Sequence, residues 1–101
     1  MAASKEKIDY NYRQMIELVV ELNNIAGELE NIKGSFDTVL SGLGTGWKGR
    51  SADDYRNQGS GVSGFMQENI SYLKSVSSGI KRTAAAYREA EYEKIEQSKG
   101  E

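Results

Sequence analysis

The sequence contains no histidine, no cysteine and no proline among its 101 residues. Without histidine the chain lacks the commonest general base and the commonest zinc ligand. Without cysteine it has no disulfide, no thiol nucleophile and no cysteine-based metal site. Its carboxylates are spread along polar stretches and are not gathered around a nucleophile. We therefore expect no enzymatic activity, no cofactor and no bound metal.

The sequence also lacks a strong charge of either sign and a long apolar run. Thirteen lysines and arginines against fifteen aspartates and glutamates leave a formal charge of -2, which argues against a nucleic-acid partner. The longest apolar run near the N-terminus is Leu18–Val20, whereas a secretory signal needs roughly 7–15 apolar residues and a membrane span about 20. Composition alone therefore predicts a cytosolic protein.

The first half has the apolar periodicity of one long amphipathic helix, which the lack of proline permits. We expect this helix over residues 5–42, with a second apolar line beside the first that makes the apolar face wide. The first line is Ile8, Tyr12, Met15, Val19, Leu22, Ala26, Leu29, Phe36, Leu40 and Leu43, and the second is Leu18, Ile25, Ile32 and Val39.

A weaker seven-residue repeat predicts a second helix over residues 51–96, followed by a frayed tail at 97–101. Ser51 is expected to cap its start, with Asp54 reaching back as in a capping box. Three glycines at 59, 61 and 64 oppose a regular helix there. Either the helix bends, or the other helix approaches closely. The unbroken repeat favours close approach.

Four glycines between residues 42 and 49 permit a tight reversal, so the turn is expected at 43–50. The fold class predicted for the single domain at 1–101 is therefore all-α, an antiparallel helical hairpin. Its apolar faces are too broad to be covered within one hairpin, which predicts pairing into a four-helix bundle. The residues expected at the dimer interface are Met15, Val19, Leu22, Leu29, Phe36, Met66, Leu73 and Ile80.

The only tryptophan, Trp47, lies in this predicted turn. Its indole could staple the turn by packing near Leu43 and Tyr55. It could also be an exposed anchor for a partner, since tryptophan is common at interface hot spots. The two roles are compatible, because a ring at the end of a bundle can be half covered.

Trp47-Lys48-Gly49, central in a chain of this length and flanked by two long helices, resembles the signature of the WXG100 family of ESAT-6-like proteins. Ala52 and Tyr55 stand where that family commonly has a small and an aromatic residue. The resemblance covers nearly the whole chain. It implies a homodimer, or a heterodimer with a related WXG100 protein, that leaves the cell folded through a type VII (ESX) secretion system without a cleaved signal.

The resemblance also implies an export signal of the form Tyr-x-x-x-Asp/Glu in the second helix. Tyr87 and Glu91 are the first candidate pair, and Tyr92 with Glu96 is the second. In the family this signal joins the partner's Trp-x-Gly turn, here Trp47 and Gly49, into one mark for the secretion ATPase. Tyr87 also falls on the apolar repeat, so it could simply be a core residue.

Two functions are therefore open. The first is a secreted substrate or co-substrate of a type VII system. The second is a cytosolic chaperone or adaptor that pairs with the helical region of a larger toxin and targets it for export. Membrane disruption by an amphipathic helix is disfavoured, because the polar faces are acidic and not rich in lysine and arginine.

Overall fold

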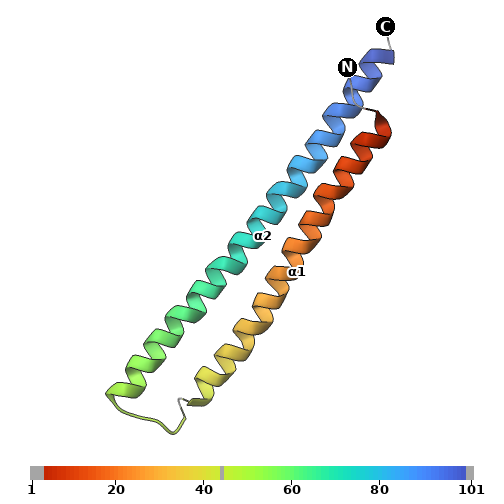
Figure 1. The fold of residues 1–101 in the computed structure, drawn as a ribbon. Coiled ribbons are helices and arrows are strands. Elements are labelled where there is room, and N and C mark those ends of the chain that lie inside the picture. The colour runs from red at the N-terminus through yellow and green to blue at the C-terminus, as the bar shows by residue number, and fades with distance from the viewer. Residues whose placement is uncertain (1–3, 44, 100–101) are drawn as a thin grey trace. The chain divides into compact units, whose positions relative to one another are not determined.

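The computed structural model describes residues 4–43 and 45–99. These residues form two helices, α1 (Lys5–Leu43) and α2 (Arg50–Lys99), and contain no strand (Figure 1). The predicted all-α helical hairpin is confirmed, with Trp47 in the loop between the helices. Helix α2 continues to Lys99, past its expected end near residue 96, while residues 100 and 101 of the expected tail lie outside the described range.

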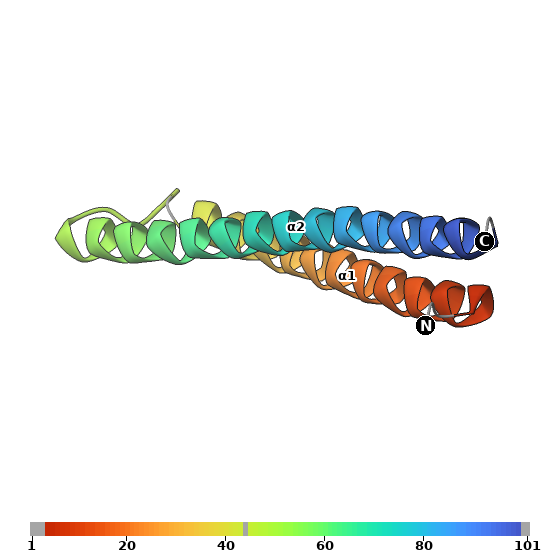
Figure 2. The same cartoon turned by 90° about the horizontal axis from the view of Figure 1, so that it is seen from above.

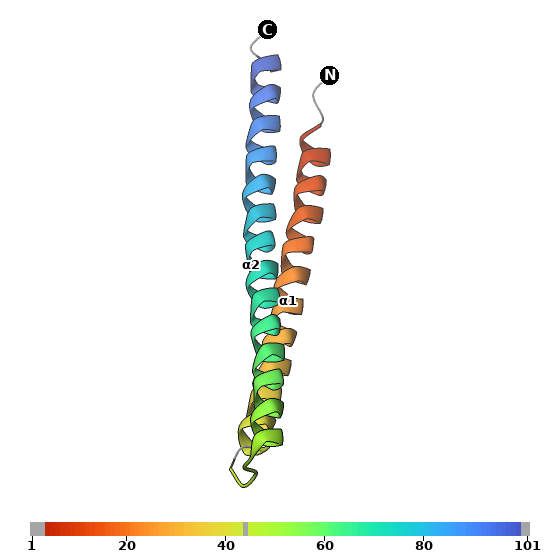
Figure 3. The ribbon, with the colours of Figure 1, turned by 90° about the vertical axis from the view of Figure 1, so that its left-hand side faces the viewer.

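The chain divides into two compact parts, which we call the turn part and the terminal part. The turn part comprises residues 24–74, and the terminal part combines the start of α1, up to residue 23, with α2 from residue 75 onward. In the turn part, the loop joins the last turns of α1 to the first turns of α2 (Figure 2). In the terminal part, the first turns of α1 run beside the C-terminal half of α2 (Figure 3).

In the turn part, α1 and α2 approach closely because α2 presents small residues to α1. Ala26 of α1 and Ala52 and Ile70 of α2 are buried. A Cβ atom built on Gly59 would lie 2.5 Å from Leu40 Cδ1, so only glycine fits there without movement. The close approach expected at the glycine segment is thus confirmed at Gly59. At Gly61 and Gly64 a Cβ atom would meet nothing within 4 Å.

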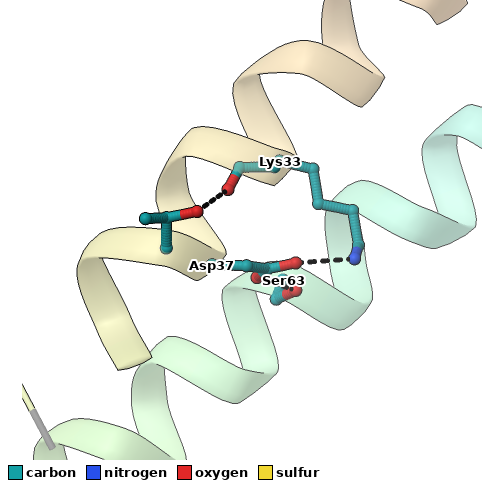
Figure 4. Close-up of polar contacts among 5 residues, drawn as sticks. Lys33, Asp37 and Ser63 are labelled. Atoms are coloured by element: carbon teal, nitrogen blue, oxygen red, sulfur yellow. Dashed lines mark hydrogen bonds and ion pairs between the residues drawn. The ribbon is translucent and has the colours of Figure 1, made fainter. Parts of the chain in front are cut away.

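A polar contact also joins the two helices of the turn part (Figure 4). The Asp37 carboxylate accepts hydrogen bonds from Lys33 Nζ at 2.8 Å and from Ser63 Oγ at 2.6 Å. These two donors, Lys33 first, lower the pKa of Asp37 below its usual value. Glu30 of α1 and Lys74 of α2 form an ion pair that also joins the two helices of this part.

The terminal part has the same antiparallel arrangement and its own buried contacts. Ile8 and Val19 of α1 are buried, as is Ala84 of α2. Ser77 is 3 % exposed, and its hydroxyl donates to the Val19 carbonyl at 3.4 Å. The buried hydroxyl therefore has the partner that a polar group inside a protein needs.

The second apolar line of α1 stays outside both parts' cores. Its four members are between 44 and 64 % exposed, although they are large aliphatic side chains: Leu18, Ile25, Ile32 and Val39. The first line supplies the buried residues Ile8, Val19 and Ala26 instead. One face of α1 is thus used within the hairpin, and the neighbouring face is left to solvent.

Candidate functional site at the Trp-x-Gly turn

The loop between Leu43 and Arg50 begins with a local cap on the end of α1. Thr45 Oγ1 donates to the Gly42 carbonyl at 2.8 Å, and Thr45 N donates to the same oxygen at 3.5 Å. These bonds satisfy a carbonyl that the end of a helix leaves without a partner. Thr45, two residues before Trp47, is therefore tied to the last turn of α1.

Gly49 is the residue at which the loop turns into α2. Its φ is 114°, a region that side chains with a Cβ rarely adopt, and it is the only described residue with a positive φ. Its carbonyl accepts the first main-chain bond of α2, from Asp53 N at 3.1 Å. The glycine of the Trp-x-Gly motif is therefore required by the backbone conformation of this chain.

The expected cap at Ser51 is wrong. Helix α2 begins at Arg50, so Ser51 lies inside the first turn, and the capping position belongs to Gly49. The sequence pattern of Ser51 and Asp54 resembles a capping box but is displaced by two residues from the true start. Asp53, which also lies in the first turn, suits the positive end of the helix dipole.

Trp47 makes one contact through its ring and one through its main chain. The indole packs on the Tyr55 ring, with ring centroids 5.5 Å apart and planes inclined by 55°. The Trp47 carbonyl accepts a hydrogen bond from Arg56 Nη2. The side chain nevertheless stays 40 % exposed. The predicted contact with Tyr55 is confirmed, and the exposed edge leaves the ring accessible to a partner.

An apolar groove of about 220 Å³ lies on the turn part next to this loop. Tyr55, which carries the Trp47 ring, is also part of its wall. The groove is lined by Phe36, Val39, Leu40, Leu43, Tyr55, Gln58, Gly59 and Val62. Its exposed rim includes Val39 and Val62, at 64 and 49 %. Sequence periodicity indicated the apolar residues but not the groove, because the groove depends on the close approach at Gly59.

Tyr87 and Glu91, the first candidate export pair, lie one turn apart on α2 in the terminal part. Tyr87 is half-buried, and its hydroxyl accepts a hydrogen bond from Asn11 Nδ2 of α1 at 3.0 Å. Glu91 pairs with Lys94 at 3.1 Å, and its side chain is 20 % exposed. Tyr87 is thus neither fully in the core nor fully free of it.

Tyr92, of the second candidate pair, belongs to a polar cluster that sequence reasoning missed. Its hydroxyl donates to Asp9 and accepts from Arg88 Nε at 3.3 Å. The Arg88 guanidinium lies 4.8 Å from the Tyr12 ring centroid and 5.2 Å from that of Tyr92. Glu96, by contrast, is exposed. No sequence signal links residues about eighty positions apart, so only the antiparallel pairing of the helices could have revealed this cluster.

None of the eight residues expected at a dimer interface is fully exposed. Val19 is buried within the hairpin, and the other seven are half-buried: Met15, Leu22, Leu29, Phe36, Met66, Leu73 and Ile80. Their contribution to an interface between two chains stays a prediction. The four residues of the neighbouring line, from Leu18 to Val39, are more exposed than these eight.

Among the described residues, no three metal-binding side chains gather into a group that could hold an ion. Neither described helix has a stretch apolar and long enough to span a bilayer.

The comparisons with known proteins agree with the turn geometry. The model of the family described as "Proteins of 100 residues with WXG" matches residues 7–92, most of the chain and the whole turn. No curated protein and no solved structure matches the chain. The Trp-x-Gly motif in that description is Trp47-Lys48-Gly49 in this chain, and it lies in the loop between the two long helices. The chain belongs to the WXG100 family.

Proposed function

We propose that this protein is exported as a folded dimer through a type VII secretion system, as a substrate or co-substrate. WXG100 proteins are small helical proteins associated with type VII secretion, and they typically pair with partner chains. The observation that carries the proposal is the presentation of Trp47. The main chain of Trp47 is held by a hydrogen bond, and the residue is nevertheless 40 % exposed. Its large indole is therefore well suited to bind another protein.

The exposed apolar line of α1 supports pairing with a second copy or with a related WXG100 chain. Leu18, Ile25, Ile32 and Val39 recur every seven residues and therefore share one side of the helix. Their average exposure is about half, which is costly for large aliphatic side chains in water. A second hairpin that covers this line would complete a four-helix bundle.

We propose that the secretion ATPase recognises Trp47 and Gly49 of one chain together with Tyr87 and Glu91 of its partner. Tyr87 and Glu91 face the same side of α2, one turn apart, so one surface can present both. Tyr87 makes a single side-chain hydrogen bond to α1, whereas Tyr92 contacts both Asp9 and Arg88. Tyr92 would have to break more contacts than Tyr87 in order to bind the ATPase. We therefore favour Tyr87 and Glu91 as the export signal.

The test is export of Trp47→Ala from cells that carry the secretion system and from cells that lack its ATPase. We expect the variant to keep its helix content by circular dichroism and to disappear from the culture supernatant. Tyr10→Ala is the matched control, because Tyr10 is an exposed aromatic residue on α1, 56 % exposed, that lies outside the turn. Normal export of Trp47→Ala would contradict the proposal.

A second set of variants separates the two candidate signals. Tyr87→Phe and Glu91→Gln should reduce export while light scattering still finds the dimer, and Glu96→Gln should leave export unchanged. If only Glu96→Gln blocks export, the signal is the Tyr92 and Glu96 pair. Retention of the wild-type chain in the cell with a larger toxin bound would instead favour the chaperone or adaptor function.

A further inference from the structure

We propose that Arg56, oriented by Asp53, is a positioning residue that holds the main chain of Trp47 in the geometry that the export machinery reads. This inference rests on the function proposed above. It concerns two residues of α2 outside the Trp-x-Gly motif, and it assigns them to presentation of the indole. Neither residue needs to touch the export machinery itself.

The two contacts of the Arg56 guanidinium come from different nitrogens. Nη1 pairs with Asp53 Oδ1 at 2.8 Å, and Nη2 donates to the Trp47 carbonyl. The planar guanidinium holds its donors in a fixed fork, so fixing one nitrogen on Asp53 also aims the other. Asp53 lies three residues before Arg56, on the same side of the first turns of α2. The helix thereby provides a rigid base for a contact that reaches back across the loop.

The loop has few other restraints at this point. Between Thr45 and Gly49, the described main-chain contacts are Thr45 with Gly42 at one end and Gly49 with Asp53 at the other. Within the described residues, Arg56 makes the only hydrogen bond to the main chain of Trp47. The glycines at 46 and 49 add conformational freedom that such a contact must offset.

The ring contact alone would not fix the direction of the indole. Tyr55 packs on Trp47 at a tilted angle, and such aromatic contacts tolerate sliding and rotation. A hydrogen bond to the carbonyl is directional, because it weakens steeply when its angle departs from linear. Tyr55 therefore supplies attraction, and Arg56 supplies orientation. An exposed ion pair such as Arg56 with Asp53 adds little to global stability, so its contribution is local.

The side-chain chemistry separates this proposal from a simple charge effect. Lysine at position 56 would keep the positive charge but offers a single ammonium at the end of a flexible stem. It cannot hold the carboxylate and the carbonyl with a fixed fork. Glutamine would remove the charge and keep a similar stem. Arg50→Gln is the matched control, because Arg50 is the first residue of the same helix and is exposed.

The test combines two readouts, fluorescence of the purified full chain and export of the full chain from its own cells. Because Trp47 is the only tryptophan in the chain, time-resolved fluorescence anisotropy of the purified protein reports motion of this loop. We expect Arg56→Gln and Arg56→Lys to show a larger amplitude of fast indole motion, with helix content unchanged. We expect export to fall by about fivefold or more in both variants, because loss of the hydrogen bond should lower the ratio of ordered to disordered loop by about that factor. Asp53→Asn should give a smaller change in the same direction, and Arg50→Gln none.

The outcomes separate this inference from the proposed function. If Trp47→Ala blocks export while Arg56→Lys and Arg56→Gln export normally with unchanged anisotropy, the positioning role is refuted and the proposed function stands. If Trp47→Ala is exported normally, the proposed function fails. If Arg56→Gln also loses helix content, Arg56→Lys decides, since it retains the charge near the helix start. Normal export and anisotropy of that variant would overturn the proposal.

Discussion

Gly59→Ala tests the close approach of the two helices in the turn part, with Gly61→Ala as its internal control. Both glycines lie on α2, two residues apart, and both substitutions should favour the folded helix over the unfolded chain by the same amount. They differ in their surroundings. A Cβ atom at position 59 would lie 2.5 and 2.9 Å from the two Cδ atoms of Leu40, whereas one at position 61 would meet nothing within 4 Å.

The expected difference follows from two opposing contributions. Replacing a helical glycine by alanine stabilises a helix by about 1 kcal/mol. Overpacking a filled contact costs about 1–3 kcal/mol, and Leu40 would have to move because two of its atoms are too close. Gly61→Ala should therefore stabilise the protein by about 1 kcal/mol. Gly59→Ala should destabilise it by about 1 kcal/mol, a gap of about 2 kcal/mol between the two variants.

Urea unfolding followed by circular dichroism measures both variants, at one fixed protein concentration because dimerisation would shift apparent stability. A second comparison places Gly59→Ala in a Leu40→Ala background. With the obstructing side chain removed, the same substitution should become stabilising, so the sign of its effect should reverse. Equal stabilisation by Gly59→Ala and Gly61→Ala in the wild-type background would refute the close approach.

Two further substitutions test the turn and the polar contact near it. Gly49→Ala should destabilise the protein by about 1–3 kcal/mol, because φ there is 114°, while Gly46→Ala should stay within about 0.5 kcal/mol; thermal unfolding measures both. The lowered pKa of Asp37 means that its carboxylate stabilises the fold above its usual pKa near 4 and loses this effect as the pH falls below that value. In a pH series of urea unfolding, the stability difference between wild type and Asp37→Asn should therefore shrink below about pH 4; a constant difference would contradict this role.

The long-range pattern of the sequence was sufficient to predict the helices. Apolar residues at alternating spacings of three and four placed the first helix over 5–42, and α1 spans Lys5–Leu43. Without proline, no interior residue interrupts either helix. The glycine-rich turn could likewise be located, because four glycines in eight positions leave few alternatives. What periodicity could not decide was which of two neighbouring apolar lines on α1 would face α2.

Local sequence was less informative at the ends of the helices. Ser4 accepts a hydrogen bond from Lys7 N at 3.2 Å and caps α1, yet no carboxylate three residues later marks it as a capping box. At the start of α2 the sequence pattern is present but the cap is absent. Ser51 and Asp54 have the spacing of a capping box, yet the helix already begins at Arg50. Gly49 takes the capping position because the chain must reverse there, and only a glycine tolerates its φ.

The polar contacts between the helices could not be predicted at all. Ser63 with Asp37 and Tyr92 with Asp9 join residues far apart in sequence, and each depends on the register in which α1 and α2 pair. A shift of the pairing by one helical turn would separate all four side chains. The helices of a two-helix hairpin can slide, and directional contacts such as these select one register, which apolar stripes alone would not do.

The two apolar lines of α1 connect the fold to the proposed pairing. The line that contains Val19 and Ala26 faces α2, where small residues such as Ala52 and Ser77 allow close approach. The neighbouring line from Leu18 to Val39 lies beside the first on α1, and its four residues stay 44 to 64 % exposed. Completing the burial of a half-exposed aliphatic side chain gains on the order of 1 kcal/mol, so the four together offer a partner several kcal/mol. The contact that packs α1 against α2 therefore leaves a second apolar line exposed on α1, and this line supports the proposed pairing with another hairpin.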